Sequence, residues 1–228
     1  MPQLNLDTRE ITLKVVYYGP ALSGKTTNLQ QIHRLLANKV RGKMVTLDTQ
    51  DDRTLYFDFL PVEFGVEGAY KIKLKLFTVP GQVMHRSTRR VVLAGADAVA
   101  FIADSQRSAA SANAYSYRDL ETNLRANGID IGSMAQVVQF NKRDLPDVKP
   151  LEEVREAWKG TGIPTVPASA LKGEGVAETF EALLERLYRQ LDRRLSFGTK
   201  FSLTEADFLS GLMHHFQENK PEQEQPDS

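Results

Sequence analysis

The sequence predicts an α/β domain built around a mostly parallel sheet. Short apolar runs typical of strands alternate with stretches of helical periodicity, and this alternation is the signature of parallel sheets. Residues 11–18 (ITLKVVYY) form the first predicted strand, and residues 25–37 carry leucine and isoleucine at helical spacing. With 228 residues, the chain can bury one full core and still carry an appendage.

Further strands and helices follow in the same alternating order up to residue 195, without an internal repeat. Residues 1–195 are therefore predicted to form one domain. The stretch 38–61 has no clear period, and we predict no element there. The remaining predicted strands are 71–79, 98–103, 136–140 and 163–166, and the remaining predicted helices are 116–127, 151–159 and 176–194.

The character of the chain changes at residue 196. Residues 196–217 are predicted to be a C-terminal appendage with an amphipathic helix over 203–216, and residues 218–228 to be a disordered acidic tail. Residues 202–205 (SLTE) resemble a helix capping box. The apolar face of the helix has three possible uses: docking onto its own domain, which we favour, binding a partner groove, or lying on a membrane. Its members are Phe208, Leu209, Leu212, Met213 and Phe216.

Composition excludes several classes of function. Lysine plus arginine and aspartate plus glutamate both number 29, and this balance disfavours a nucleic-acid binder. The absence of cysteine excludes disulfides, thiolate metal sites and cysteine nucleophiles. We expect a cytoplasmic protein without a lipid anchor or transmembrane segment, because no apolar run is long enough and Pro2 stands where myristoylation needs glycine.

A phosphate-binding loop lies between the first strand and the first helix. Residues 19–26 (GPALSGKT) match the pattern GxxxxGK[ST]. In such a loop Lys25 reaches the β- and γ-phosphates and the Thr26 hydroxyl ligates Mg²⁺. The alternative is a glycine-rich turn with an exposed lysine, and the loop alone does not choose between ATP and GTP. The residues predicted to surround the phosphates are Gly19, Ala21, Leu22, Ser23, Gly24, Lys25, Thr26 and Thr27.

A base-recognition motif, residues 141–144 (NKRD), directly follows the strand 136–140. The two oxygens of Asp144 match the N1–H and N2–H₂ donors that guanine has and adenine lacks. Asn141 is expected at the base edge, where it also braces the phosphate loop, and Lys142 over the purine plane. The order and spacing of these motifs favour guanine and disfavour an ATP-dependent enzyme.

A second base-side segment follows the predicted strand 163–166. Its small residues, Ser169 and Ala170, precede Leu171, and we expect the Ala170 N–H to reach guanine O6. Alone this segment is not specific.

Up to about residue 195 the chain resembles the Ras superfamily, and more narrowly it is similar to the MglA family of bacterial gliding-motility polarity GTPases. Residues 78–82 occupy the place where Ras-like GTPases carry DxxGQ. The motifs that carry the narrower resemblance are VYYGP (16–20), GKTTNLQ (24–30), DRTLYFDFLP (52–61), TVPGQ (78–82), ADSQ (103–106) and NKRDLP (141–146).

The resemblance implies the fold, further site residues and partners. The fold is the P-loop NTPase fold of the Ras-like type, a three-layer α/β/α arrangement. Gly81 is expected to sense the γ-phosphate, Gln82 to orient the attacking water, and Thr54 to join Mg²⁺ and the γ-phosphate. Arg53 is expected to act as an arginine finger in cis, although from the residues alone it is a solvated loop charge. The implied partners are effector proteins and a Roadblock-domain GTPase-activating protein, with recruitment to cell poles.

Two positions near the expected γ-phosphate differ from Ras. Thr78 replaces the usual aspartate, which is itself a mark of the MglA family, and we hypothesise that Asp52 or Asp58 partly compensates. Ala21 stands where that family usually has glycine, and we hypothesise that its methyl group slows hydrolysis. The leading prediction is a guanine-nucleotide switch that binds GTP or GDP with Mg²⁺ and hydrolyses GTP slowly unless a partner stimulates it. The rival function is a GTP-binding interaction module with negligible turnover, which acts as a scaffold or regulatory partner.

Other residues are given ordinary structural roles. Asp104 and Asp119 are interpreted as a strand-end acid and a helix-surface acid, and Trp158 as an anchor of an amphipathic helix.

Overall fold

The computed structural model describes residues 2–47, 57–65, 70–80 and 86–217. Its elements are β1 (Gln3–Asn5), β2 (Glu10–Tyr18), α1 (Lys25–Leu35), β3 (Val45–Leu47), β4 (Phe57–Gly65), β5 (Lys71–Thr78), α2 (Arg86–Leu93), β6 (Ala98–Asp104), α3 (Ala110–Ala126), β7 (Ala135–Asn141), α4 (Leu151–Trp158), β8 (Thr165–Pro167), α5 (Val176–Leu195), α6 (Phe197–Phe201) and α7 (Glu205–Gln217).

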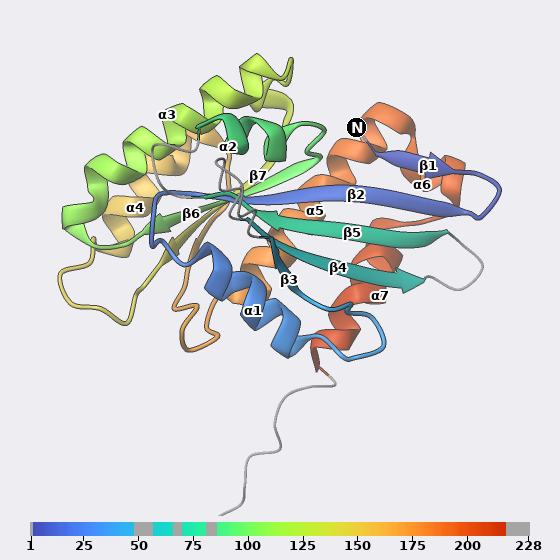
Figure 1. The fold of residues 1–228 in the computed structure, drawn as a ribbon, viewed down its shortest axis with the longest axis horizontal. Coiled ribbons are helices and arrows are strands. Elements are labelled where there is room, and N and C mark those ends of the chain that lie inside the picture. Colours follow the sequence, from blue (N-terminus) through green and yellow to red (C-terminus); the bar gives the residue numbers. More distant parts are fainter. Residues whose placement is uncertain (1, 48–56, 66–69, 81–85, 218–228) are drawn as a thin grey trace, which may run out of the picture.

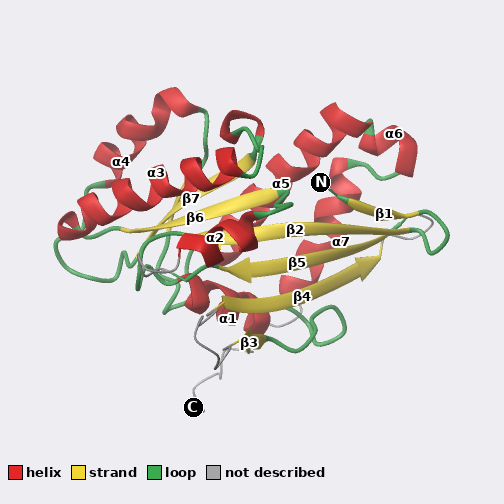
Figure 2. Ribbon diagram, turned by 45° about the horizontal axis from the view of Figure 1, so that its top comes forward, coloured by secondary structure: helices red, strands yellow, loops and turns green. Residues whose placement is uncertain are grey.

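The strands of this described part form one sheet in the order β3-β4-β5-β2-β6-β7-β8, and β1 pairs with the start of β2. The central strand β2 is parallel to both β5 and β6, and β7 and β8 continue the parallel ladder. β4 and β5 run in opposite directions, as Figure 2 shows. The sheet is therefore mostly parallel with an antiparallel edge.

Helices cover both faces of the sheet and create two cores (Figure 1). Alternate residues of β2 point to opposite faces. Leu13, Val15 and Tyr17 pack with α1, α5, α6 and α7, whereas Val16 and Tyr18 pack with α2, α3 and α4. The three-layer α/β/α arrangement that the resemblance implied is confirmed.

The structure contains elements that we did not predict, namely β1, β3, β4, α2 and α6, and α3 begins earlier than predicted. β3 and the first part of β4 lie in the stretch 38–61, for which we predicted no element. The longer of these two strands is β4. Its alternation is obscured because Asp58 is polar yet buried and because Pro61 interrupts the strand pattern. α2 was not predicted, since its sequence RSTRRVVL is rich in arginine. α3 begins at Ala110 rather than 116, in an alanine-rich stretch with high intrinsic helix propensity.

The C-terminal helix docks onto its own domain, as we favoured. Phe208, Leu212 and Phe216 of α7 are buried in the same core as α1 and α5 (Figure 1, red). The capping box lies two residues later than predicted: the Thr204 hydroxyl accepts a hydrogen bond from the Asp207 N–H, and Asp207 accepts one from the Thr204 N–H. In the described ranges, no helix combines the length and apolar character needed to cross a bilayer.

Candidate functional site

The predicted site residues gather at the carboxyl ends of the parallel strands. The loop after β2 begins at Gly19, β6 ends at Asp104, β7 ends at Asn141, and Ser169 closely follows β8. Ligands of open α/β sheets bind at this edge. The fold therefore brings together segments that are up to 150 residues apart in sequence.

The loop after β2 has a backbone that requires two of its glycines. Gly19 has φ +149°, and an added Cβ would meet the Ile102 carbonyl oxygen at 2.2 Å. Gly24 has φ +99°, and an added Cβ would meet Asn141 Nδ2 at 2.2 Å. The loop thus passes closely over β6 and β7. It leads directly into the N-terminus of α1, where backbone N–H groups can bind an anion.

Lys25 is a buried cation inside this loop. It is 7% exposed, and its Nζ donates to the carbonyl oxygens of Gly19 (3.0 Å) and Pro20 (2.6 Å). Burial, reinforced by the nearby positive charge of Arg89, lowers the pKa of Lys25 from 10.5 to about 8, with a smaller opposing influence from Asp58. An anion in the loop would stabilise the protonated form, so the environment of Lys25 fits a phosphate.

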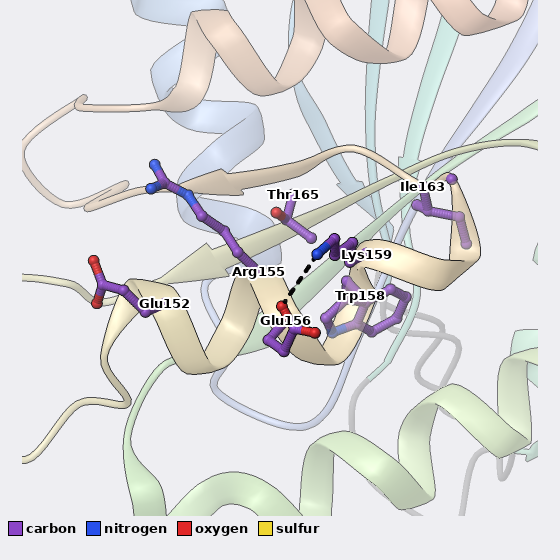
Figure 3. A pocket seen from close by; sticks show the side chains of 8 residues that line it. Glu152, Arg155, Glu156, Trp158, Lys159, Ile163 and Thr165 are labelled. Atoms are coloured by element: carbon purple, nitrogen blue, oxygen red, sulfur yellow. Dashed lines mark ion pairs between the residues drawn. The ribbon is translucent and has the colours of Figure 1, made fainter.

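A cavity of about 590 Å³ opens beside Lys25. It is lined by Ala21, Leu22, Gly24, Lys25, Thr26, Thr27, Phe57, Asp58, Thr78, Val79 and Pro80. A smaller hollow of about 460 Å³ lies between α4 and β8 (Figure 3), where exposed Glu156 and Lys159 form an ion pair of 3.7 Å beside Trp158. That hollow contains no residue of the phosphate loop, so we assign the site to the larger cavity.

Asp58 joins the phosphate loop to strands β3 and β5. This carboxylate is 4% exposed and accepts hydrogen bonds from the hydroxyls of Thr26 (2.6 Å), Thr78 (2.9 Å) and Thr46 (2.9 Å). The Asp58 N–H in turn donates to Thr78 Oγ1 at 2.8 Å. A threonine hydroxyl that donates its proton keeps two lone pairs. Thr26 can therefore bind a cation while it remains bonded to Asp58.

Asn141 ties the base side of the site to the phosphate loop. Its Nδ2 donates to the Ser23 carbonyl oxygen and its Oδ1 accepts the Ala170 N–H, both at 2.8 Å. Gln31 of α1 also donates to the carbonyl oxygen of Leu171 at 3.3 Å. The Ala170 N–H that we expected to reach guanine O6 is thus bonded to Asn141, and a contact with a base requires this hydrogen bond to be shared or exchanged.

Asp144 and Lys142 are each held by a side-chain partner. The Ser169 hydroxyl donates to Asp144 Oδ1 at 2.6 Å, and this hydrogen bond is the main cause that lowers the pKa of Asp144. Asp144 therefore remains ionised. Because its two oxygens together offer about four acceptor sites, both can still accept hydrogen bonds from a ligand. Lys142 has φ +66° and its Nζ lies 2.6 Å from Asp104 Oδ2. Asp104, which we interpreted only as a strand-end acid, thus fixes the lysine expected over the purine.

Several expected site residues lie outside the described residues: Asp52, Arg53, Thr54, Gly81 and Gln82. Their roles stay predictions.

The interpretation of Asp119 as a helix-surface acid is wrong. Asp119 is 8% exposed, and it accepts hydrogen bonds from Arg89 Nε (2.8 Å) and from the hydroxyl of Tyr18. The residues that share its helical face, Ser116 and Asn123, are buried as well but polar, so the apolar periodicity of α3 carried no signal for the burial of Asp119. The ion pair between Arg89 and Asp119 connects α2 and α3 next to the phosphate loop.

Comparison with known proteins agrees with this geometry. Residues 3–187 match the model of the ADP-ribosylation factor (Arf) family. The chain is 43% identical over 193 residues to the mutual gliding-motility protein MglA of Myxococcus xanthus (strain DK1622), an alignment that covers 85% of this chain and 99% of that protein. It is 27% identical over 187 residues to the Ras-related protein Rab-27B of Rattus norvegicus, covering 79% and 82% of the two chains.

Proposed function

We propose that this chain, which belongs to the ADP-ribosylation factor family of small GTPases, is a Mg²⁺-dependent switch in bacterial cell polarity or gliding motility. As a small GTPase it binds GTP and GDP and hydrolyses GTP. The similarity to MglA, whose name refers to gliding motility, supports the cellular role. Effector proteins and a Roadblock-domain activating protein are the proposed partners, and such partners would recruit the chain to cell poles.

The main evidence that a nucleotide binds in this cavity is the buried charge of Lys25. Its two hydrogen bonds within the described residues go to carbonyl oxygens, and burial makes its positive charge costly. A phosphate oxygen supplies the counter-charge that this position lacks. The loop N–H groups and the N-terminus of α1 add to the same positive field.

The oxygen atoms of Thr26 and Asp58, which lie beside Lys25, are of the kind that bind Mg²⁺. When bound, the ion neutralises charge on the β- and γ-phosphates. We propose that Thr26 ligates it directly and that Asp58 takes the place of the aspartate missing at position 78. The proposal is supported by the shared hydrogen bonds of Asp58 with Thr26 and Thr78.

We further propose that Gln82 orients the attacking water, Arg53 offsets charge in the transition state, and Thr54 completes the Mg²⁺ site. These roles rest on the resemblance of the motifs around them.

The rival function is a GTP-binding module with negligible turnover. Ala21 favours it, because this residue lines the cavity beside Lys25 and its methyl group takes space there. The presence of Arg53, Thr54 and Gln82, which the resemblance implies for hydrolysis, opposes it.

The test begins with nucleotide-stripped protein in Mg²⁺. We expect competitive binding of GDP and GTP but not of ADP, and single-turnover hydrolysis that a Roadblock-domain protein accelerates. Binding of GTP with no hydrolysis under either condition would establish the rival function. Failure to bind any guanine nucleotide would reject both.

The proposed role of Asp58 has its own test. Asp58→Asn should reduce the effect of Mg²⁺ on GDP affinity about tenfold, since one charge-assisted interaction of about 1.5 kcal/mol is lost. Asp52→Asn is the comparison variant. If both variants retain the wild-type response to Mg²⁺, compensation for Thr78 lies elsewhere.

A further inference from the structure

The C-terminal extension, defined here as residues 197–217 with the helices α6 and α7, lies beyond the family match. The match ends at residue 187, whereas α6 and α7 span 197–217. The extension is nevertheless buried in the main core. Phe197, Leu203, Phe208 and Leu212 are fully buried. Because the extension is so well packed, the elements that it contacts indicate what it stabilises.

The extension contacts three elements whose opposite ends reach the cavity. The Ala37 N–H, just after α1, donates to the His215 carbonyl oxygen at 3.2 Å. Phe64 near the end of β4 makes an edge contact with Phe208, with ring centroids 5.8 Å apart. Tyr70, directly before β5, makes a similar contact with Phe201 at 4.9 Å.

The other ends of the same three elements carry the bonded cluster of the cavity. Thr26 is at the start of α1, Asp58 at the start of β4 and Thr78 at the end of β5, and Asp58 accepts a hydrogen bond from each threonine. β4 and β5 are paired in continuous register between these ends. Asp58 and Phe64 are about 20 Å apart along the strand. The extension is therefore remote from the cavity, yet it is attached to the three elements that carry Thr26, Asp58 and Thr78.

The extension is itself anchored on α5. The hydroxyl of Tyr188 donates to the Leu203 carbonyl oxygen at 2.7 Å, and Phe180 packs against Phe216 with ring centroids 5.9 Å apart. Arg189 pairs with Glu205 at 2.7 Å on the surface. α5 therefore provides a fixed support, and the extension transfers that support to α1, β4 and β5.

We propose that the C-terminal extension is a brace that holds α1, β4 and β5 in the arrangement in which Asp58 meets Thr26 and Thr78, and thereby slows release of Mg²⁺-bound nucleotide. The proposal rests on the proposed nucleotide site. Because coupling between two sites is reciprocal, Mg²⁺ and nucleotide must also stabilise the docked extension.

The test uses the full chain with Phe208→Ala and measures release of fluorescently labelled GDP. Release in Mg²⁺ should be about 2- to 30-fold faster than in wild type, the range found for mutations in coupled elements. Leu124→Ala is the matched control, because Leu124 is equally buried but packs in the opposite core against other elements. Ser210→Ala, on the exposed face of α7, is the surface control. Neither control should change the release rate.

A double variant separates bracing from simple core filling. In the Asp58→Asn background, Phe208→Ala should have little further effect on release, since the contact through which the brace acts is already altered. Equal acceleration in both backgrounds overturns the proposal. If Phe208→Ala does not fold, Phe208→Leu serves in its place.

Hydrogen exchange provides the reciprocal measurement. The amides of α7 in wild type should exchange more slowly with Mg²⁺ and GDP than without ligand. Unchanged exchange overturns the brace. Absence of GDP binding to the wild-type chain rejects the proposed function instead, so the two failures are distinguishable.

Discussion

The two halves of the site differ in how well the protein stabilises the groups that are expected to meet the nucleotide. On the base side, Asn141 and Asp144 are hydrogen-bonded to Ser23, Ala170 and Ser169. On the phosphate side, Lys25 is buried with its charge opposed by burial and by Arg89. The base side is thus pre-organised for selectivity. The phosphate side carries an electrostatic cost that a bound anion removes.

The largest expected effect concerns the base side. Asp144→Asn should weaken GDP binding about a thousandfold, because two charge-assisted hydrogen bonds to the guanine edge are lost. Xanthosine diphosphate, which presents a carbonyl acceptor at C2, should bind the variant better than GDP does. Asp147→Asn, an exposed position in the same loop, is the control and should leave competition binding unchanged. Wild-type GDP affinity in Asp144→Asn would show that Asp144 does not contact the base.

The charge on Lys25 should appear in the stability of nucleotide-free protein. Its pKa is lowered from 10.5 in the unfolded chain to about 8 in the fold, so the cost is full below pH 8 and falls between pH 8 and 10.5. Over this interval wild type should gain about 3 kcal/mol in free energy of unfolding relative to Lys25→Met, since each pKa unit is worth about 1.4 kcal/mol. Urea unfolding at several pH values measures this gain. Parallel pH curves for the two proteins would contradict the assigned cost.

Removal of the Ser169 hydroxyl tests how much the hydrogen bond that holds Asp144 contributes to GDP affinity. Ser169→Ala should reduce GDP affinity about fivefold at neutral pH, the worth of one hydrogen bond near 1 kcal/mol. The loss should grow as the pH falls, because the hydrogen bond from Ser169 is what lowers the pKa of Asp144. Ser169→Thr retains a hydroxyl and should behave as wild type. Calorimetric titration with GDP at several pH values distinguishes these outcomes.

The smallest expected effect is at Ala21. Ala21→Gly should raise the single-turnover rate of GTP hydrolysis severalfold, because it removes a methyl group beside Lys25. GDP affinity should stay the same and serves as the control. An unchanged or lower rate would reject the steric explanation for slow hydrolysis.

The base side and the phosphate loop could be predicted from sequence because each motif directly follows a strand. NKRD after β7 and GPALSGKT after β2 need only local patterns to be placed at the same sheet edge. The hydrogen bonds of Asp58 could not be derived this way, since they join β4 to Thr26 and to Thr78 across gaps of 32 and 20 residues. Sequence reasoning suggested Asp58 only as one of two acids near Thr54.

Burial of charged residues explains most of the remaining errors. Arg89 and Asp119 satisfy each other inside the fold, so a helix rich in arginine and an acid on α3 looked exposed when each was considered alone. Pro61 and buried Asp58 likewise hid the alternation of β4. The apolar face of α7 was visible in sequence, but its docking partners, such as Phe64 and Phe180, became evident only in three dimensions.

The position of Trp158 has a practical consequence for spectroscopy. It is the only tryptophan of the chain, and its ring packs edge-on against Tyr117 at 5.3 Å, in the core formed with α3 and α4. Intrinsic fluorescence excited at the indole therefore reports on that layer alone. Undocking of α7 on the opposite face should be optically silent, which makes an introduced fluorophore on α7 the appropriate reporter for its movement.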